Sequence, residues 1–137
     1  MKTFKNNSKY HISEHIVYNC KYHVIFCPKY RRRVLVDGID ERLKDIFRET
    51  AFRHGFDIPD LEVMPDYVHL LIDCNPKYGI MQCIKDLKRE SASLLGKEFP
   101  HLKSRLPNIW TRSVFVASVG TVSLETVKKY IKNQKSV

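Results

Sequence analysis

The stretch DIPDLEVMPDYVHLLIDC, residues 57–74, predicts two consecutive β-strands that are joined near Pro65 and Asp66. Both halves contain Val and Ile, which favour a pleated strand, and a Pro-Asp pair is typical of a turn. We therefore expect one strand at residues 57–66 and a second, neighbouring strand at residues 67–74.

A helical pattern precedes this pair of strands. Residues 40–54 place Leu43, Ile46 and Phe47 on one stripe of a helix, at the spacing that a core-facing helix requires. Gly55 follows directly and is a good terminator, because glycine readily adopts the left-handed conformation found after helix ends. The segment before the strand pair is therefore expected to be an amphipathic helix that packs on the sheet.

The remaining segments complete an alternation of strands and helices. The expected elements are a strand at 16–27, a helix at 40–54, strands at 57–66 and 67–74, a helix at 79–99, a strand at 109–119 and a last helix that begins at Ser123. This β-α-β-β-α-β order predicts an α+β fold, a ferredoxin-like antiparallel sheet with helices on one face plus a C-terminal helix. Residues 1–137 are expected to form a single domain, because this length suits one ordinary core.

The charge balance points to a class of partner. Lys and Arg number 24 against 15 Asp and Glu, which gives a formal net charge of +9 and a pI near 9.5. This excess favours a polyanion, and nucleic acid is the first candidate. Apolar residues make up 43% of the chain and charged residues 28%, a balance that is typical of a folded protein and excludes a disordered one.

Targeting signals and cysteine motifs are missing from the sequence. Residues 1–15 have no apolar core of signal-peptide length, and no stretch approaches a membrane span. Cys20, Cys27, Cys74 and Cys83 form no CxxC pair, which argues against zinc-ribbon and thioredoxin-like proteins. We expect a cytoplasmic protein with reduced thiols and no membrane partner.

The strand at residues 67–74 carries a single histidine. Strand alternation separates two sets of side chains, Val68, Leu70 and Ile72 on one face, and Tyr67, His69 and Leu71 on the other. The first set suits a core covered by helices, so His69 is expected on the opposite face. A lone histidine on a strand is more often a packing residue than a ligand.

The last helix adds a second group of candidate residues. A step of 100° per residue places Leu124, Val127 and Ile131 in one apolar arc. Tyr130 and Gln134, spaced i and i+4, lie together on one edge of that arc. A tyrosine hydroxyl beside an amide oxygen on a lysine-rich helix could place a nucleophile and a ligand for a hard metal against the same phosphate.

Three segments together resemble a known family. The segments YHVIFCPKYRRRVL (22–35), MPDYVHLLIDCNP (64–76) and ETVKKYIKNQ (125–134) are similar, in this order and spacing, to the single-tyrosine HUH transposases of small bacterial insertion sequences, the TnpA type. The resemblance covers nearly the whole chain. It implies a ferredoxin-like homodimer that cleaves and rejoins single-stranded DNA next to a hairpin, through a 5′-phosphotyrosine intermediate and with a divalent cation, Mg²⁺ or Mn²⁺.

The resemblance also implies roles for individual residues. Tyr130 would be the nucleophile, His69 the second histidine of the HUH motif and Gln134 the third metal ligand. The first histidine of the motif falls on Tyr67, where this sequence departs from the family pattern. Two functions therefore stay open: a transposase that works with an altered metal site, and a catalytically impaired relative that binds hairpin DNA without cleaving it.

The basic segment that follows the first strand is the best candidate for contacts to DNA phosphates. Its members are Lys29, Tyr30, Arg31, Arg32 and Arg33, and the aromatic ring among them could stack on a base.

Two further expectations concern the rest of the surface. The cations of the helix at residues 79–99, Lys85, Lys88 and Arg89, are expected to form a plain solvent face. A third function, a generic RNA-binding module, would need an exposed aromatic side chain on a central strand, for which Tyr22 is the candidate. That function would leave the pairing of Tyr130 with Gln134 unexplained.

Overall fold

The computed structural model of the protein describes residues 2–3, 10–105, 108–120 and 124–132. Its elements are β1 (Lys2–Thr3), β2 (His11–Ser13), β3 (Ile16–Tyr18), β4 (Lys21–Phe26), the short 3-10 helix η1 (Lys29–Arg31), α1 (Ile39–His54), β5 (Asp57–Met64), β6 (Tyr67–Asp73), α2 (Ile80–Glu98), α3 (Pro100–Arg105), β7 (Phe115–Ser118) and α4 (Leu124–Lys132). None of the described helices combines the length and apolar character that a membrane span requires.

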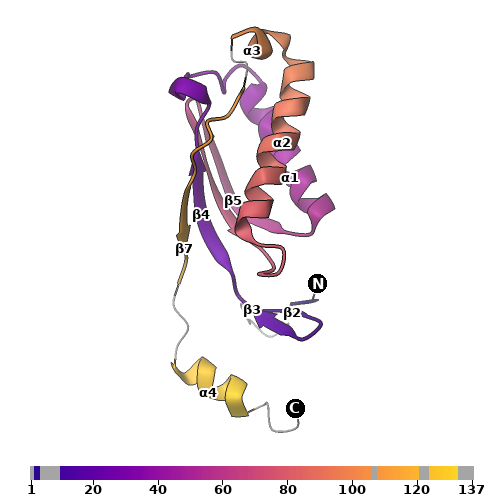
Figure 1. Cartoon of the computed structure of the whole chain (residues 1–137), viewed down its shortest axis with the longest axis vertical. Helices are drawn as coiled ribbons and strands as arrows, with labels where there is room; N and C mark the ends of the chain where they lie inside the picture. The colour runs from indigo at the N-terminus through magenta and orange to yellow at the C-terminus, as the bar shows by residue number, and fades with distance from the viewer. Residues whose placement is uncertain (1, 4–9, 106–107, 121–123, 133–137) are drawn as a thin grey trace.

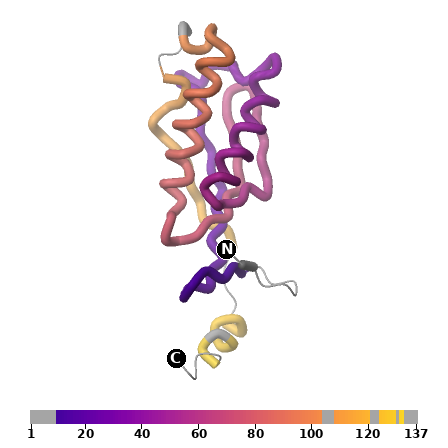
Figure 2. Tube along the Cα trace, turned by 90° about the vertical axis from the view of Figure 1, so that its right-hand side faces the viewer, coloured from indigo at the N-terminus to yellow at the C-terminus, as the bar shows by residue number. Residues whose placement is uncertain are grey.

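The main sheet has the strand order β5-β6-β4-β7, and all of its neighbouring strands are antiparallel. Helices α1 and α2 lie side by side and cover one face of this sheet (Figures 1 and 2). The chain passes through β4, α1, β5, β6, α2 and β7 in that order. This is the ferredoxin-like α+β arrangement that the sequence predicts, so the expected fold class is confirmed.

The core lies between the sheet and the two helices. Val68, Leu70 and Ile72 of β6 are fully buried, together with Leu43 of α1 and Leu87 of α2. Because side chains alternate along a strand, burial of this set turns the intervening residues of β6 to the other face of the sheet. Neither α1 nor α2 covers that face (Figure 1).

Local sequence signals predict the boundaries around the central strand pair correctly. Helix α1 ends at His54 because Gly55 adopts a φ of +76°, and the Gly55 N–H bonds to the Ala51 carbonyl. Strands β5 and β6 are joined at Pro65 and Asp66, as expected.

The expected first strand at residues 16–27 is wrong as a single element. It forms two strands, β3 and β4, with Asn19 and Cys20 between them. Strand β3 pairs with β2 in a separate sheet of order β1-β2-β3, whereas β4 lies inside the main sheet. The pattern of apolar residues is continuous across the break because both strands bury apolar side chains, so it does not reveal the change of partner.

The expected strand at residues 109–119 is correct only for Phe115–Ser118. Upstream of β7, Trp110 forms one isolated bridge with Pro28, and its buried indole Nε1 donates a hydrogen bond to Ser91 Oγ at 2.9 Å. The segment is held by this ring and by backbone hydrogen bonds to Cys27 and Lys29, and it forms no longer strand there. Helix α3 was not predicted, and the expected helix start at Ser123 lies outside the described residues.

Candidate functional site

Two histidines lie together on the sheet face that α1 and α2 leave uncovered. His69 is on β6, and His23 is on the adjacent strand β4, on the same face as Ile25, the register partner of His69. His23 Nδ1 and His69 Nε2 are 3.1 Å apart, and the two rings stack with 5.2 Å between their centroids. His23 is exposed and His69 is half-buried. The expected position of His69 on the uncovered face is confirmed.

The donor atoms of this pair have the spacing that a metal ion needs. Bonds of about 2.1 Å from a cation to two ligands at right angles place those ligands about 3 Å apart. The nitrogen atoms of His23 and His69 already have this separation. Glu62, the register partner of His69 on β5, brings Oε2 to 3.7 Å from His69 Nδ1 and can orient the ring. In this structure the two nitrogens share a hydrogen bond, and they are the donor atoms that could hold a divalent cation on this face.

His23 is a candidate ligand that the sequence pattern did not reveal. Alternation within residues 21–26 places it on the same face as Ile25, but alternation does not specify which strand lies next to β4. The pairing of Ile25 with His69 joins segments that are far apart in the sequence, and this pairing brings the two imidazoles together. Tyr67 lies half-buried at the start of β6, and its register partner is Met64.

Helix α4 lies beyond the lower end of the main sheet, apart from α1 and α2 (Figure 1). Its backbone includes Tyr130, but the side chain of Tyr130 and the whole of Gln134 lie outside the described part of the chain. Leu124, Val127 and Ile131 are 69%, 37% and 63% exposed. An apolar arc with this exposure is typical of a surface that another chain covers.

The basic segment forms a strained turn at the end of β4. The N–H of Lys29 bonds to the Ile109 carbonyl at 2.8 Å, which ties the turn to the segment before Trp110. Tyr30 and Arg31 have φ values of 61° and 49°, in the left-handed region that non-glycine residues rarely adopt. Tyr30 is 73% exposed. Such strain is common where side chains serve binding.

The three arginines of this segment differ in their surroundings. Arg31 donates a hydrogen bond to Asp66 Oδ2 at 2.8 Å, so its charge is already paired with the turn between β5 and β6. This contact raises the pKa of Arg31. Arg32 and Arg33 are exposed, and no ion pair is formed by either of them within the described part of the protein. They are therefore the two arginines of the turn that form no ion pair among the described residues.

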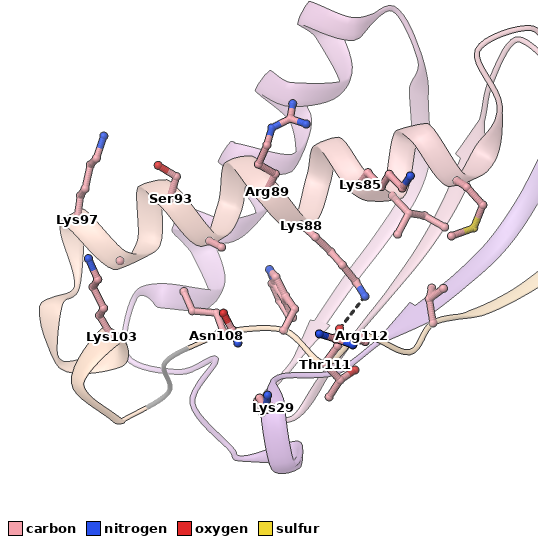
Figure 3. A pocket seen from close by; sticks show the side chains of 17 residues that line it. Lys29, Lys85, Lys88, Arg89, Ser93, Lys97, Lys103, Asn108, Thr111 and Arg112 are labelled. Atoms are coloured by element: carbon pink, nitrogen blue, oxygen red, sulfur yellow. Dashed lines mark hydrogen bonds between the residues drawn. The ribbon is translucent and has the colours of Figure 1, made fainter.

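A groove of 1180 Å³ lies along α2 and α3, between these helices and the segment that leads to β7 (Figure 3). Cationic side chains come from every element around it, and they are Lys29, Lys85, Lys88, Arg89, Lys97, Lys103 and Arg112. Lys85 and Arg89 are exposed, as the expected solvent face requires, whereas Lys88 is half-buried, and all three border this concave surface. A concave surface lined by one sign of charge focuses the electrostatic potential on an anion.

Lys88 differs from the other cations of the groove. Its Nζ donates hydrogen bonds to the carbonyls of Thr111 at 2.8 Å and Ser113 at 3.2 Å, the first of which Figure 3 shows. Burial lowers its pKa. The Lys88 side chain therefore fixes one wall of the groove.

Tyr22 does not have the exposure that a generic RNA-binding module would need. It lies on the helix-covered side of β4 and packs against the hydrophobic core. Burial is the largest cause of its raised pKa. The six-residue strand β4 turns Tyr22, Val24 and Phe26 to the same inner face, which argues against the RNA-binding alternative for which Tyr22 was the candidate.

Comparison with known proteins identifies relatives over most of the chain. A family model described as transposase IS200 like matches residues 16–134. The ISDra2 transposase TnpA of Deinococcus radiodurans is 39% identical over 120 residues, which cover 86% of each chain. The transposase for insertion sequence element IS200 of Salmonella typhimurium is 31% identical over 122 residues, 88% of this chain and 80% of that relative.

Solved structures agree with these matches. A crystal structure of a proposed transposase from Deinococcus radiodurans superposes with a TM-score of 0.74 at 40% identity, covering 92% of this chain and 98% of the other. A REP-associated tyrosine transposase bound to a REP hairpin superposes with a TM-score of 0.59 over 89% of this chain and 68% of the other. The second likeness, at 16% identity, shows a common fold.

Proposed function

The chain belongs to the IS200-like transposase family, and from this premise we propose that it cleaves and rejoins single-stranded DNA next to a hairpin through a tyrosine nucleophile. The observation that carries the proposal is the contact of His69 with His23 on an uncovered sheet face. The contact supplies two imidazoles even though Tyr67 stands at the first position of the HUH motif. The protein therefore acts on DNA as a transposase with an altered pair of metal ligands.

The proposed reaction uses Tyr130 of α4. Its phenol oxygen attacks the scissile phosphorus, the bond to the 3′-oxygen breaks, and the products are a 5′-phosphotyrosine and a free 3′-hydroxyl. The covalent link keeps the phosphodiester energy for later strand joining. His69 and His23 would hold a divalent cation, Mg²⁺ or Mn²⁺, with Gln134 as third ligand. When bound, such a cation polarises the phosphate oxygens and lowers the barrier to attack.

A covalent adduct is the signature that tests this proposal. A single-stranded oligonucleotide with a hairpin, labelled at its 3′ end, should become attached to the protein in denaturing gels when Mn²⁺ or Mg²⁺ is present. Chelation of the cation should prevent attachment. If the protein binds the hairpin tightly but forms no adduct with either metal, it is the non-cleaving relative, in which Tyr67 has removed catalysis.

The hairpin partner is supported by the distribution of cations. The groove along α2 and α3 can follow a phosphate backbone, and its lining includes Lys29 of the basic turn. Tyr30 is exposed, with the ammonium of Lys29 over its ring at 5.9 Å from the centroid, and it can stack on an unpaired base next to Arg32 and Arg33. We propose that the groove and the basic turn bind one continuous DNA ligand.

Replacement of Arg32 and Arg33 by Ala together should weaken DNA binding and reduce its salt dependence. Each lost phosphate contact lowers the slope of log affinity against log salt by about 0.7 to 0.9. Titrations at several salt concentrations measure the slope. Arg42→Ala is the matched control, since this arginine lies on α1 and is paired with Glu98. If the double variant and the control give the same slope, Arg32 and Arg33 face solvent and do not contact DNA phosphates.

A homodimer is proposed from two apolar surfaces that the described chain leaves exposed. One is the arc of α4, and the other lies on the uncovered sheet face, where Phe115 is 57% and Met64 is 39% exposed. Docking of α4 on this face of a second copy would bury both surfaces and bring Tyr130 towards His69.

Light scattering should give a mass of twice the 16.1 kDa of one chain. Leu124→Lys should shift the protein to monomer, because it places a charge in the apolar arc, whereas Glu125→Lys on the neighbouring polar side should remain dimeric. A wild-type protein that is monomeric at micromolar concentration would contradict the proposal.

A further inference from the structure

A buried polar cluster joins the N-terminal sheet to one end of the main sheet. His11 of β2 and Asp73 of β6 are 5% and 6% exposed, and His11 Nε2 lies 2.7 Å from Asp73 Oδ2. Asp57 of β5 completes the group, in which one ligand atom from each of the three residues lies within 4.8 Å of the others. The cluster therefore contains one imidazole and two carboxylates at the spacing of a metal site.

Several polar atoms of this cluster and its surroundings are buried without a hydrogen-bond partner in the described residues. They are His11 Nδ1, Asp73 Oδ1, Tyr18 Oη and Asn19 Oδ1. Folded proteins leave few buried polar atoms unpaired, and an ion or ordered water commonly explains those that remain. His11 and Asp73 thus each use one polar atom in their mutual contact and keep a second one available.

The two carboxylates are placed against each other by the sheet. Asp57 and Asp73 are register partners in β5 and β6, and like charges directly opposite each other destabilise an antiparallel pair. The register of β5 shifts between Asp57 and Asp60, beside the cluster. Such irregularities re-aim side chains and are frequent next to functional sites. Lys21 of β4 is the register partner of Asp73 on its other side.

The tyrosine of the cluster adds no positive charge. The Tyr18 ring stacks on His11, with 4.9 Å between the centroids. Burial, followed by the charges of Asp73 and Asp57, raises the pKa of Tyr18 to about 12, so its hydroxyl is neutral at physiological pH. The cluster therefore brings two carboxylates and one imidazole together, with His11 and Asp73 buried and Asp57 exposed.

A second group of similar composition gives a useful contrast. His54, Asp86 and Glu90 also bring their ligand atoms within 4.8 Å of one another. Their carboxylates are already bonded by donors of the protein, which are Tyr78, Gln82 and Arg89 for Asp86, and Thr50, Arg53 and His54 for Glu90. That group is a satisfied network between α1 and α2, whereas the cluster around His11 retains free acceptors.

We propose that His11, Asp57 and Asp73 bind a divalent transition-metal ion that fastens the N-terminal sheet to the main sheet. An imidazole with two carboxylates suits Mn²⁺ or Zn²⁺ better than Ca²⁺ or Mg²⁺, which prefer all-oxygen sites. Asp73 follows His69 by four residues on the same strand, about 13 Å away along an extended chain. The site is therefore distinct from the one at His69, and it does not rest on the proposed catalytic function.

Mn²⁺ binding to the full-length His69→Ala protein tests the proposal, because that background removes one of the two imidazoles, His69 and His23, that are proposed to hold a metal on the uncovered face. Electron paramagnetic resonance of free Mn²⁺ measures the stoichiometry and affinity. The His69→Ala protein should bind about one equivalent of Mn²⁺, and Mn²⁺ should raise its unfolding temperature. Adding Asp57→Asn should weaken Mn²⁺ binding by at least about tenfold and remove the temperature shift, since loss of even an outer-shell partner costs about 10- to 100-fold.

Asp60→Asn in the same background is the matched control, because it removes a neighbouring exposed carboxylate of β5 that is outside the cluster. It should bind Mn²⁺ as the His69→Ala protein does. Asp57 is exposed, so its replacement should leave the fold intact, and circular dichroism is the check. The proposal would be overturned if the His69→Ala protein bound no Mn²⁺, or if adding Asp57→Asn left its Mn²⁺ affinity unchanged.

Discussion

Tyr130→Phe should reduce the covalent protein–DNA adduct to background, a loss of more than about a thousandfold, as expected when a nucleophile is removed. The substitution deletes the attacking oxygen and keeps the ring and the helix. Affinity for the hairpin should therefore remain within about twofold of wild type, because phosphate contacts dominate affinity. The measurement is the fraction of 3′-labelled single strand that is attached to protein after incubation with Mn²⁺, together with a binding titration.

Tyr67→Phe is the matched control for this experiment. It removes the hydroxyl of the tyrosine that lies on the same strand and face as His69, and it should form the adduct as efficiently as the wild type. If instead Tyr130→Phe keeps the adduct and Tyr67→Phe loses it, the nucleophile is Tyr67 and the assignment of α4 is wrong. Loss in both variants would make Tyr67 a second participant in the reaction.

The strand pair and the helix before it show what local sequence can predict. Glycine after a helix and a Pro-Asp turn between two strands act on their immediate neighbours, so the end of α1 at Gly55 and the turn at Pro65 were predicted correctly. The division between β3 and β4 was not predicted. The two strands share one continuous apolar pattern and differ only in the strands with which they pair. Strand pairing depends on segments distant in the sequence, which a local pattern does not contain.

The candidate site follows the same rule. The face of His69 could be predicted from alternation along one strand, and its half-buried position on the uncovered face agrees. The contact of His23 with His69 could not be predicted in this way, because it depends on the register of β4 against β6. The position of Lys88 could not be predicted for a related reason. Helical periodicity assigns this residue to the solvent-exposed face of α2, but its ammonium donates hydrogen bonds to two carbonyls of a segment that is distant in the sequence.

His23→Ala should lower adduct formation by about tenfold to a hundredfold at limiting Mn²⁺, if His23 replaces the missing histidine of the motif. The loss should shrink as the metal concentration rises, because excess metal compensates for weaker binding. A metal titration of the initial cleavage rate measures both effects. His15→Ala is the matched control, since it removes an exposed imidazole between β2 and β3 and should leave the titration unchanged.

Tyr67→His should then rescue the His23→Ala protein. Residues 67 and 69 project from the same face of β6, so the substitution provides two imidazoles on one strand. A neutral phenol is a weak ligand at pH 7, whereas imidazole binds Mn²⁺ well. Cleavage at limiting Mn²⁺ should return at least to the wild-type level, and Tyr67→His alone should exceed it. If the His23→Ala protein cleaves like the wild type, His23 is not a metal ligand. If the protein with both His23→Ala and Tyr67→His binds hairpin DNA but regains neither metal binding nor cleavage, the assignment of His69 as a metal ligand fails as well.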